Sequence, residues 1–134
     1  MKYKRVLLKV SGEALSGKTP IDFEKATETA LQIKALHDAG CLLGVVVGGG
    51  NIWRGRSGGT MDRSRADNIG MLATAMNALA LEQALIDLNV PVRVLSAVSM
   101  DMFMDSYSAR EANKSVDAGT VVIFACASGG PFFS

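Results

Sequence analysis

The sequence predicts a three-layer α/β/α domain with a mainly parallel sheet. Short β-branched runs alternate along the chain with longer segments whose apolar residues have helical spacing. Glycine-rich or polar loops follow three of the strand-like runs, at 9–12, 48–54 and 128–134. The chain has 134 residues and is 49% hydrophobic and 20% charged, which is enough to bury a core. We therefore expect a single domain over residues 1–134.

Composition argues against several classes of partner. The net charge of +1 gives no indication of nucleic-acid binding or of attraction to a membrane surface. Cys41 and Cys126 both lie in apolar runs, which favours reduced core thiols and a cytoplasmic location. With one histidine and no Cys-x-x-Cys, we expect no metal site. The basic start is followed by an apolar run that Lys9 interrupts, so neither a signal peptide nor a spanning helix is expected.

The first predicted strand, at 5–10, ends in a Ser-Gly turn. Lys9 is a cation near the end of an otherwise apolar strand, and it is either a snorkelling edge lysine or a phosphate-binding group. A Walker loop is excluded because the lysine precedes its glycine. A helix is predicted from an Asp22 N-cap to Gly40. One face of it comprises Phe23, Ala26, Ala30, Ile33 and His37. His37, near the helix C-terminus, is expected to be a surface residue or one that interacts with the helix dipole.

The second predicted strand, at 41–47, leads directly into three glycines. Glycines allow backbone N–H groups to approach an anion with no Cβ in the way. Arg54, shortly after them, offers a planar cation suited to phosphate. These features favour a phosphate site at the end of a parallel strand, and an ordinary glycine turn is the alternative.

A long helix is predicted from about residue 66 to residue 88. Ser64 and Asp67 have the spacing of a capping box, which makes Asp67 a capping residue on this pattern. The segment is apolar nearly all round, so most of its faces should be buried. In a chain this short, a subunit interface is a natural way to bury them.

The last third of the chain repeats the strand–helix–strand pattern. A turn at 89–91 leads into a third strand at 92–97, and a methionine-rich apolar patch follows at 100–104. Ser108 and Glu111 form a second capping box, which opens a short helix ending before Gly119. A fourth strand is predicted at 120–125, followed by the glycine-rich stretch 128–134.

Three loops should meet at one edge of this sheet, because ligands in parallel α/β sheets bind beyond the carboxyl ends of the strands. A dinucleotide-binding oxidoreductase is disfavoured, since Gly-x-Gly-x-x-Gly fails after both of the first two strands. A non-catalytic interaction domain would not explain why cations and glycines gather there. A phosphoryl-transfer enzyme explains them best, because such catalysis is mostly positioning and charge stabilisation around phosphates.

Four stretches carry a family resemblance: 9–15, 48–55, 67–79 and 131–134. With them the chain resembles the amino-terminal part of the bacterial-type uridylate kinases (UMP kinases) of the amino-acid kinase superfamily. The glycine motif alone would also suit carbamate or acetylglutamate kinases, whereas the long helix and the Pro-Phe-Phe segment favour the uridylate branch. The resemblance implies a carbamate kinase-like fold. It also implies phosphoryl transfer from ATP to UMP, giving UDP and ADP in pyrimidine nucleotide biosynthesis.

The resemblance assigns roles residue by residue. It implies that Lys9 and Arg54 are catalytic, and that Asp67 accepts from the UMP ribose, which replaces the capping role. The implied ATP- and phosphoryl-binding residues are Lys9, Ser11, Gly12, Gly50 and Arg54. The implied UMP-binding residues are Gly49, Asp67, Ser128, Gly129, Gly130, Pro131, Phe132, Phe133 and Ser134. Gly130 stands where the family commonly has asparagine.

The resemblance also implies partners and a longer parent chain. Mg²⁺ would arrive with ATP, no organic cofactor would be needed, and a cytoplasmic homohexamer with GTP and UTP as effectors is implied. Family members are considerably longer, so we expect a truncated chain that holds the nucleoside monophosphate-binding part. Such a chain should be inactive alone. The alternative to a partial UMP kinase is a non-catalytic nucleotide-binding fragment.

Overall fold

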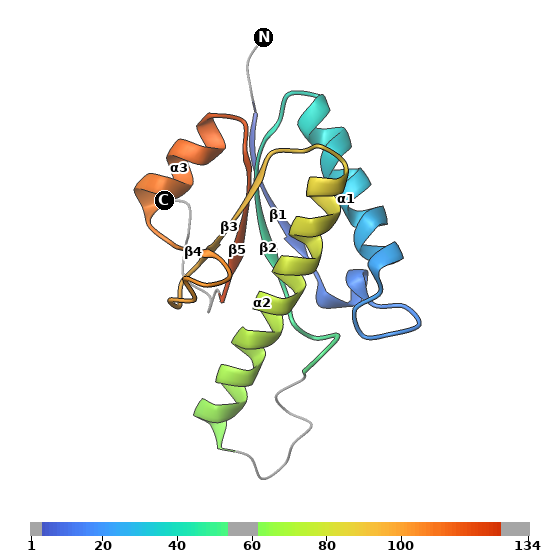
Figure 1. Ribbon diagram of the computed structural model, residues 1–134, viewed down its shortest axis with the longest axis vertical. Helices are drawn as coiled ribbons and strands as arrows, with labels where there is room; N and C mark the ends of the chain where they lie inside the picture. Colours follow the sequence, from blue (N-terminus) through green and yellow to red (C-terminus); the bar gives the residue numbers. More distant parts are fainter. Residues whose placement is uncertain (1–3, 54–61, 127–134) are drawn as a thin grey trace.

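The computed structural model describes residues 4–53 and 62–126 (Figure 1). Strands and helices alternate in the order β1 (Arg5–Val10), η1 (Gly12–Leu15), α1 (Phe23–Asp38), β2 (Leu42–Val47), α2 (Arg63–Asp87), β3 (Val92–Ser96), β4 (Asp105–Ser106), α3 (Ala109–Asp117) and β5 (Val121–Ala125). Here η1 is a short 3₁₀ helix.

The described strands form one parallel sheet in the order β1-β2-β5-β3-β4. One register row runs from Lys9 through Val46 and Phe124 to Leu95. The parallel sheet predicted from the sequence is confirmed, with a fifth strand added. The two-residue β4 was missed because it is short, polar and exposed, and so has no strand periodicity.

Helices cover both faces of the sheet, which confirms the three layers. On one face, α1 and α2 pack with β2 and β5 around a core that includes Ile33, Leu43, Val45, Leu81 and Ile123. On the other face, α3 packs its buried Ala112 and Val116 against Leu95, Val122 and Phe124. Because α3 is the one described helix on this second face, β1 is left open there, and Leu7 is 43% exposed.

α1 begins and ends as predicted. The Asp22 carboxylate accepts from the Glu24 backbone N–H at 2.9 Å, and Gly40 adopts φ +97° just past the helix. One prediction for its apolar face is wrong. Phe23 is 44% exposed, because the first helical residue lies outside the packed stretch. His37 is half-buried, with its Nε2 atom 2.8 Å from the Gly119 carbonyl oxygen.

α2 begins earlier than predicted. The Asp62 side chain accepts from the Arg65 N–H at 3.4 Å and caps the helix. The predicted Ser64–Asp67 capping box is therefore wrong, because both residues already lie inside the helix. The second capping box is confirmed: Ser108 Oγ accepts from the Glu111 N–H at 3.1 Å.

α2 is a core helix with one open stripe. Its buried side is rich in alanine and includes Leu81 and Leu85, whereas Leu72, Met76 and Ile86 are 53%, 46% and 50% exposed. Within this chain the sheet and α1 cover one side of the helix, so the burial of its other faces in a subunit interface stays a prediction. By length and composition it is the one described helix that could cross a membrane, a test that core helices also pass. Its amino-terminal half extends beyond the carboxyl ends of the strands (Figure 1).

Candidate phosphate-binding site

The loops that follow β1 and β2 touch at the carboxyl edge of the sheet. The Gly48 N–H donates to the Val10 carbonyl at 2.9 Å. A Cβ atom on Gly12 would overlap Asn51 Oδ1 and would lie 2.9 Å from the Gly50 nitrogen. Glycine is therefore required at position 12 by the close approach of the two loops. Sequence reasoning placed these loops at one edge, and the structure confirms that they meet.

Unpaired backbone N–H groups line this junction. Within residues 4–53 and 62–126, no acceptor lies within hydrogen-bond reach of the N–H groups of Gly12, Gly49 or Gly50. Lys9 is exposed at the end of β1, and Ser11 is exposed at the N-cap position of η1. Backbone N–H groups at adjoining loops, together with a lysine and a hydroxyl on the same loops, are suited to binding phosphate oxygens.

A buried pair of side-chain amides anchors the glycine turn to α2. Asn77 is fully buried, and its Nδ2 donates to the Gly48 carbonyl and to Asn51 Oδ1, both at 2.7 Å. Asn51 Nδ2 donates in return to Asn77 Oδ1 at 3.0 Å and to the Pro20 carbonyl at 2.8 Å. The pair thus joins three segments: the turn after β2, the helix α2 and the loop before α1.

The same face of α2 supports the other loop ends. A Cβ on Gly49 would lie 2.9 Å from Ala73 Cβ and 3.1 Å from the Gly70 carbonyl oxygen, so the turn rests directly on the helix. Thr74 Oγ1 accepts from the Cys126 N–H at 2.9 Å, which ties down the end of β5. Gly70, Ala73, Thr74 and Asn77 are spaced i, i+3, i+4 and i+7, so they lie on one side of the helix.

The other predicted site residues divide into two groups. Asp67 is exposed in the second turn of α2, and no described residue pairs with its carboxylate. Asp67 does not cap the helix, and its predicted contact with the ribose stays a prediction. Arg54 and residues 128–134 lie outside the described residues, so the assignments of Arg54, Ser128, Gly129, Gly130, Pro131, Phe132, Phe133 and Ser134 also stay predictions.

Sequence reasoning missed the amide pair and the tie at Thr74. Asn77 is a single amide among buried alanines and leucines of α2, and a buried amide needs partners. That pattern was a usable signal, although it could not name Asn51, 26 residues away, as the partner. Trp53 was also missed: its indole N–H is buried, and no acceptor for it lies in the part of the chain that is described.

A groove runs beside the free edge of β1. It has a volume of about 560 Å³. Residues from the end of β1, from η1 and from α1 line it, among them Lys9, Ser11, Glu13, Lys25 and Glu28. Its charges have both signs, and it adjoins the junction of the two loops through Lys9 and Ser11.

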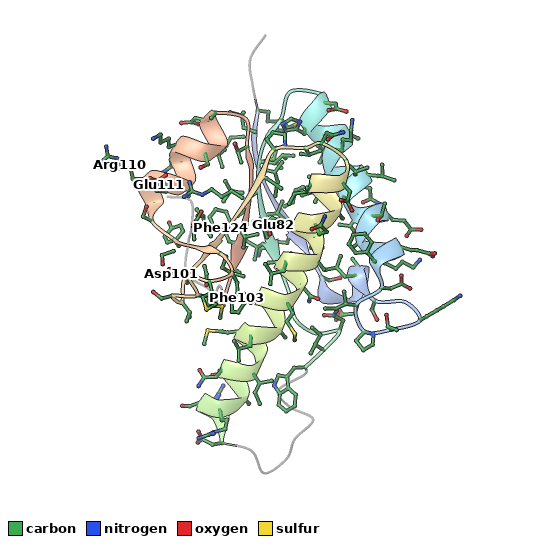
Figure 2. The ribbon with its side chains drawn as sticks, in the orientation of Figure 1. Glu82, Asp101, Phe103, Arg110, Glu111 and Phe124 are labelled. Carbon is green, nitrogen blue, oxygen red and sulfur yellow. The ribbon has the colours of Figure 1, made fainter. Side chains whose placement is uncertain are left out.

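A second groove, of about 330 Å³, lies at the opposite edge of the sheet. Figure 2 shows Glu82 on α2 and Asp101 and Phe103 on the loop before β4, and these residues line the groove with Arg93 and Asp105. Burial raises the pKa of the Glu82 carboxyl above its ordinary value, and nearby Asp105 adds to the rise. Hydrogen bonds to Glu111 and Asp105 raise the pKa of Arg93. Across 4–53 and 62–126, no three metal-ligating side chains gather.

The fold and the junction together define a class of protein. A parallel α/β domain whose first two strands end in such adjoining loops has the architecture in which phosphates and nucleotides are commonly bound. Residues 4–131 match the model of the Amino acid kinase family, and the chain belongs to that family.

Two solved structures are similar to this chain over its whole length. A UMP kinase from Ureaplasma parvum is 40% identical, with a TM-score of 0.90 over 100% of this chain. A UMP kinase from Bacillus anthracis is 36% identical, with a TM-score of 0.88 over 98% of this chain. The chain spans 58% and 56% of those two proteins. The predicted family and α/β architecture are confirmed.

Proposed function

We propose that this chain is the nucleoside monophosphate-binding part of a UMP kinase, which transfers a phosphoryl group from ATP to UMP in pyrimidine nucleotide biosynthesis. One observation carries the proposal: the Gly12 loop and the Gly48–Gly50 turn meet at the end of β1 and β2, and within the described residues the N–H groups of Gly12, Gly49 and Gly50 donate no backbone hydrogen bond. The identity of 40% and 36% to two UMP kinases supports UMP as the acceptor.

In this proposal each described residue has a task that its chemistry suits. Gly49 faces the UMP phosphate, while Gly12, Gly50 and Ser11 hold the phosphoryl group in transfer. Lys9 is exposed and at the loop edge, so its ammonium can approach the negative charge of the transferred group. The carboxylate of Asp67 is exposed and has no partner among residues 4–53 and 62–126, so it is available to accept from the ribose hydroxyls. Arg54 and the 128–134 loop complete the phosphate and uracil contacts.

The proposal extends to the metal and to assembly. The described groups at the loop edge are mostly N–H donors and a lysine, which suit phosphate and do not form a Mg²⁺ site of their own. Mg²⁺ would therefore be held by the ATP phosphates. The open stripe of α2, with Leu72 and Met76 about half exposed, supports a homo-oligomer. A hexamer, GTP or UTP effectors and a cytoplasmic location are the finer form of the proposal.

Calorimetric titration of the purified chain with UMP, CMP and AMP tests the proposal. We expect UMP to bind most tightly, with affinity that falls as salt rises because phosphate contacts are charged. The exposed variant Gln83→Ala, at the far end of α2, serves as a control that should bind UMP as the wild type does. Equal affinity for all three nucleotides, or tightest binding of AMP, would refute UMP as the acceptor.

A further inference from the structure

We propose that Asn51 and Asn77 are positioning residues, whose paired side-chain amides hold the glycine turn in the shape that presents its N–H groups to phosphate. The inference rests on the proposed function only in naming UMP as the ligand. Neither side chain is expected to touch the substrate, because both are occupied by protein partners.

The pair satisfies every amide hydrogen that it contains. Asn77 Nδ2 carries two hydrogens, and they go to the Gly48 carbonyl and to Asn51 Oδ1. Asn51 Nδ2 carries two more, and they go to Asn77 Oδ1 and to the Pro20 carbonyl. Four bonds of 2.7–3.0 Å with no spare donor fix both amide planes and define one arrangement of the turn.

The location of the pair argues for a task in the site. The neighbouring buried residues on α2 are apolar, among them Ala73, Ala78 and Leu81, and a leucine at position 77 would continue that surface. A leucine cannot hold the Gly48 carbonyl, and that carbonyl belongs to the first residue of the glycine turn. The amide at position 77 thus anchors the turn to the helix by hydrogen bonds, which an apolar side chain cannot make.

The amide pair of Asn51 and Asn77 constrains both phosphate loops. Asn51 bonds to Pro20, in the segment that connects η1 to α1, so the amide pair ties the turn after β2 to the chain that follows the first loop. Gly12 sits against Asn51, with no room for a Cβ beside its Oδ1 atom. Movement of the Asn51 amide would therefore change the spacing between the N–H groups of Gly12 and Gly50, and with it the fit to phosphate oxygens.

A pair of α2 variants separates positioning from simple stabilisation. Asn77→Leu keeps the number and branching of the side-chain heavy atoms and removes the hydrogen bonds. Leu81→Val weakens the core one turn further along the helix, at a residue that makes no hydrogen bond to the glycine turn. UMP affinity is measured by calorimetry, and by the fluorescence of Trp53, the single tryptophan, at a temperature where circular dichroism shows both variants folded. We expect Asn77→Leu to lose at least tenfold in UMP affinity and Leu81→Val to stay within twofold of the wild type.

Equal affinity of Asn77→Leu and wild type, or an equal loss in Leu81→Val, would overturn the proposal. If Asn77→Leu fails to fold, Asn51→Ala removes the same pair from the half-buried loop side, and the same tenfold loss is expected.

A ligand-free measurement keeps the inference separate from the proposed function. In ¹H–¹⁵N spectra, the Gly49 and Gly50 amide signals should be sharp in wild type and in Leu81→Val, and broadened in Asn51→Ala. If the wild type does not bind UMP, the proposed function is wrong, and these line widths alone decide the positioning role. Unchanged line widths in Asn51→Ala would then overturn it.

Discussion

Gly49 rests on α2 so closely that a single methyl group should displace the turn. A Cβ there would lie 2.9 Å from Ala73 Cβ, 3.1 Å from the Gly70 oxygen and 3.4 Å from the Thr74 nitrogen. Carbon atoms normally pack at about 3.5–4.0 Å, so the turn must move by about 0.6 Å or more. The helix cannot yield by rotating a side chain, because the three atoms are a Cβ and two backbone atoms. Overpacking of this kind typically costs about 1–3 kcal/mol.

Gly49→Ala should therefore lower the melting temperature by about 4–12 °C, taking roughly 4 °C per kcal/mol for a domain of this size. Thermal unfolding followed by circular dichroism measures the shift, and UMP titration measures the displacement of the N–H groups. Gly70→Ala is the matched control, because its Cβ would meet Trp53 Cδ1 at an ordinary 3.8 Å. Alanine is favoured over glycine inside a helix by about 1 kcal/mol, so this control should melt higher than wild type. A lower melting temperature in both variants, or in neither of them, would refute the packing argument.

Three further outcomes are expected. In a chain that carries the whole fold, Lys9→Ala and Arg54→Ala should each lower steady-state turnover roughly 10²–10³-fold with little change in melting temperature; rates within a few-fold of wild type would remove the phosphate role. The 134-residue chain alone should release no ADP from UMP and Mg-ATP and should self-associate by light scattering, because it spans 58% of a similar UMP kinase and leaves an α2 stripe open; UMP-dependent ADP release or a monodisperse monomer would contradict this. Because the pKa of Glu82 is higher in the folded than in the unfolded chain, folding stability falls as pH rises through the interval between the two pKa values. The melting temperature of Glu82→Gln should therefore exceed that of the wild type at pH 7 and equal it near pH 4. A difference in melting temperature that does not change with pH would contradict this.

Local signals in the sequence were enough for most of the fold. Gly40 and Gly119 end their helices at positive φ, and Ser108 caps α3 as its pattern predicts. The start of α2 could not be chosen from sequence, because Asp62 and Ser64 are both good N-cap residues and tertiary packing decides between them. β4 carries no signal of its own, because two polar residues join the sheet only where β3 already offers a partner.

The candidate site could be predicted only in part. Parallel strands end at one edge, so the contact between the Gly12 loop and the Gly48–Gly50 turn followed from the order of strands and loops. The amide pair did not follow, because a side-chain hydrogen bond between Asn51 and Asn77 depends on how α2 packs across the sheet. Sequence patterns identify the groups that face a ligand more readily than the buried groups that hold them in place.

The central claim is that the glycine turn and the first loop bind the phosphate of UMP. The most direct measurement is a UMP titration of the ¹⁵N-labelled chain, followed amide by amide in ¹H–¹⁵N spectra. The account predicts that the largest shifts fall on the amides of Gly12, Gly49 and Gly50 and saturate together. Shifts that gather instead around Glu82 and Phe103 at the opposite edge, or no shifts at all, would contradict it.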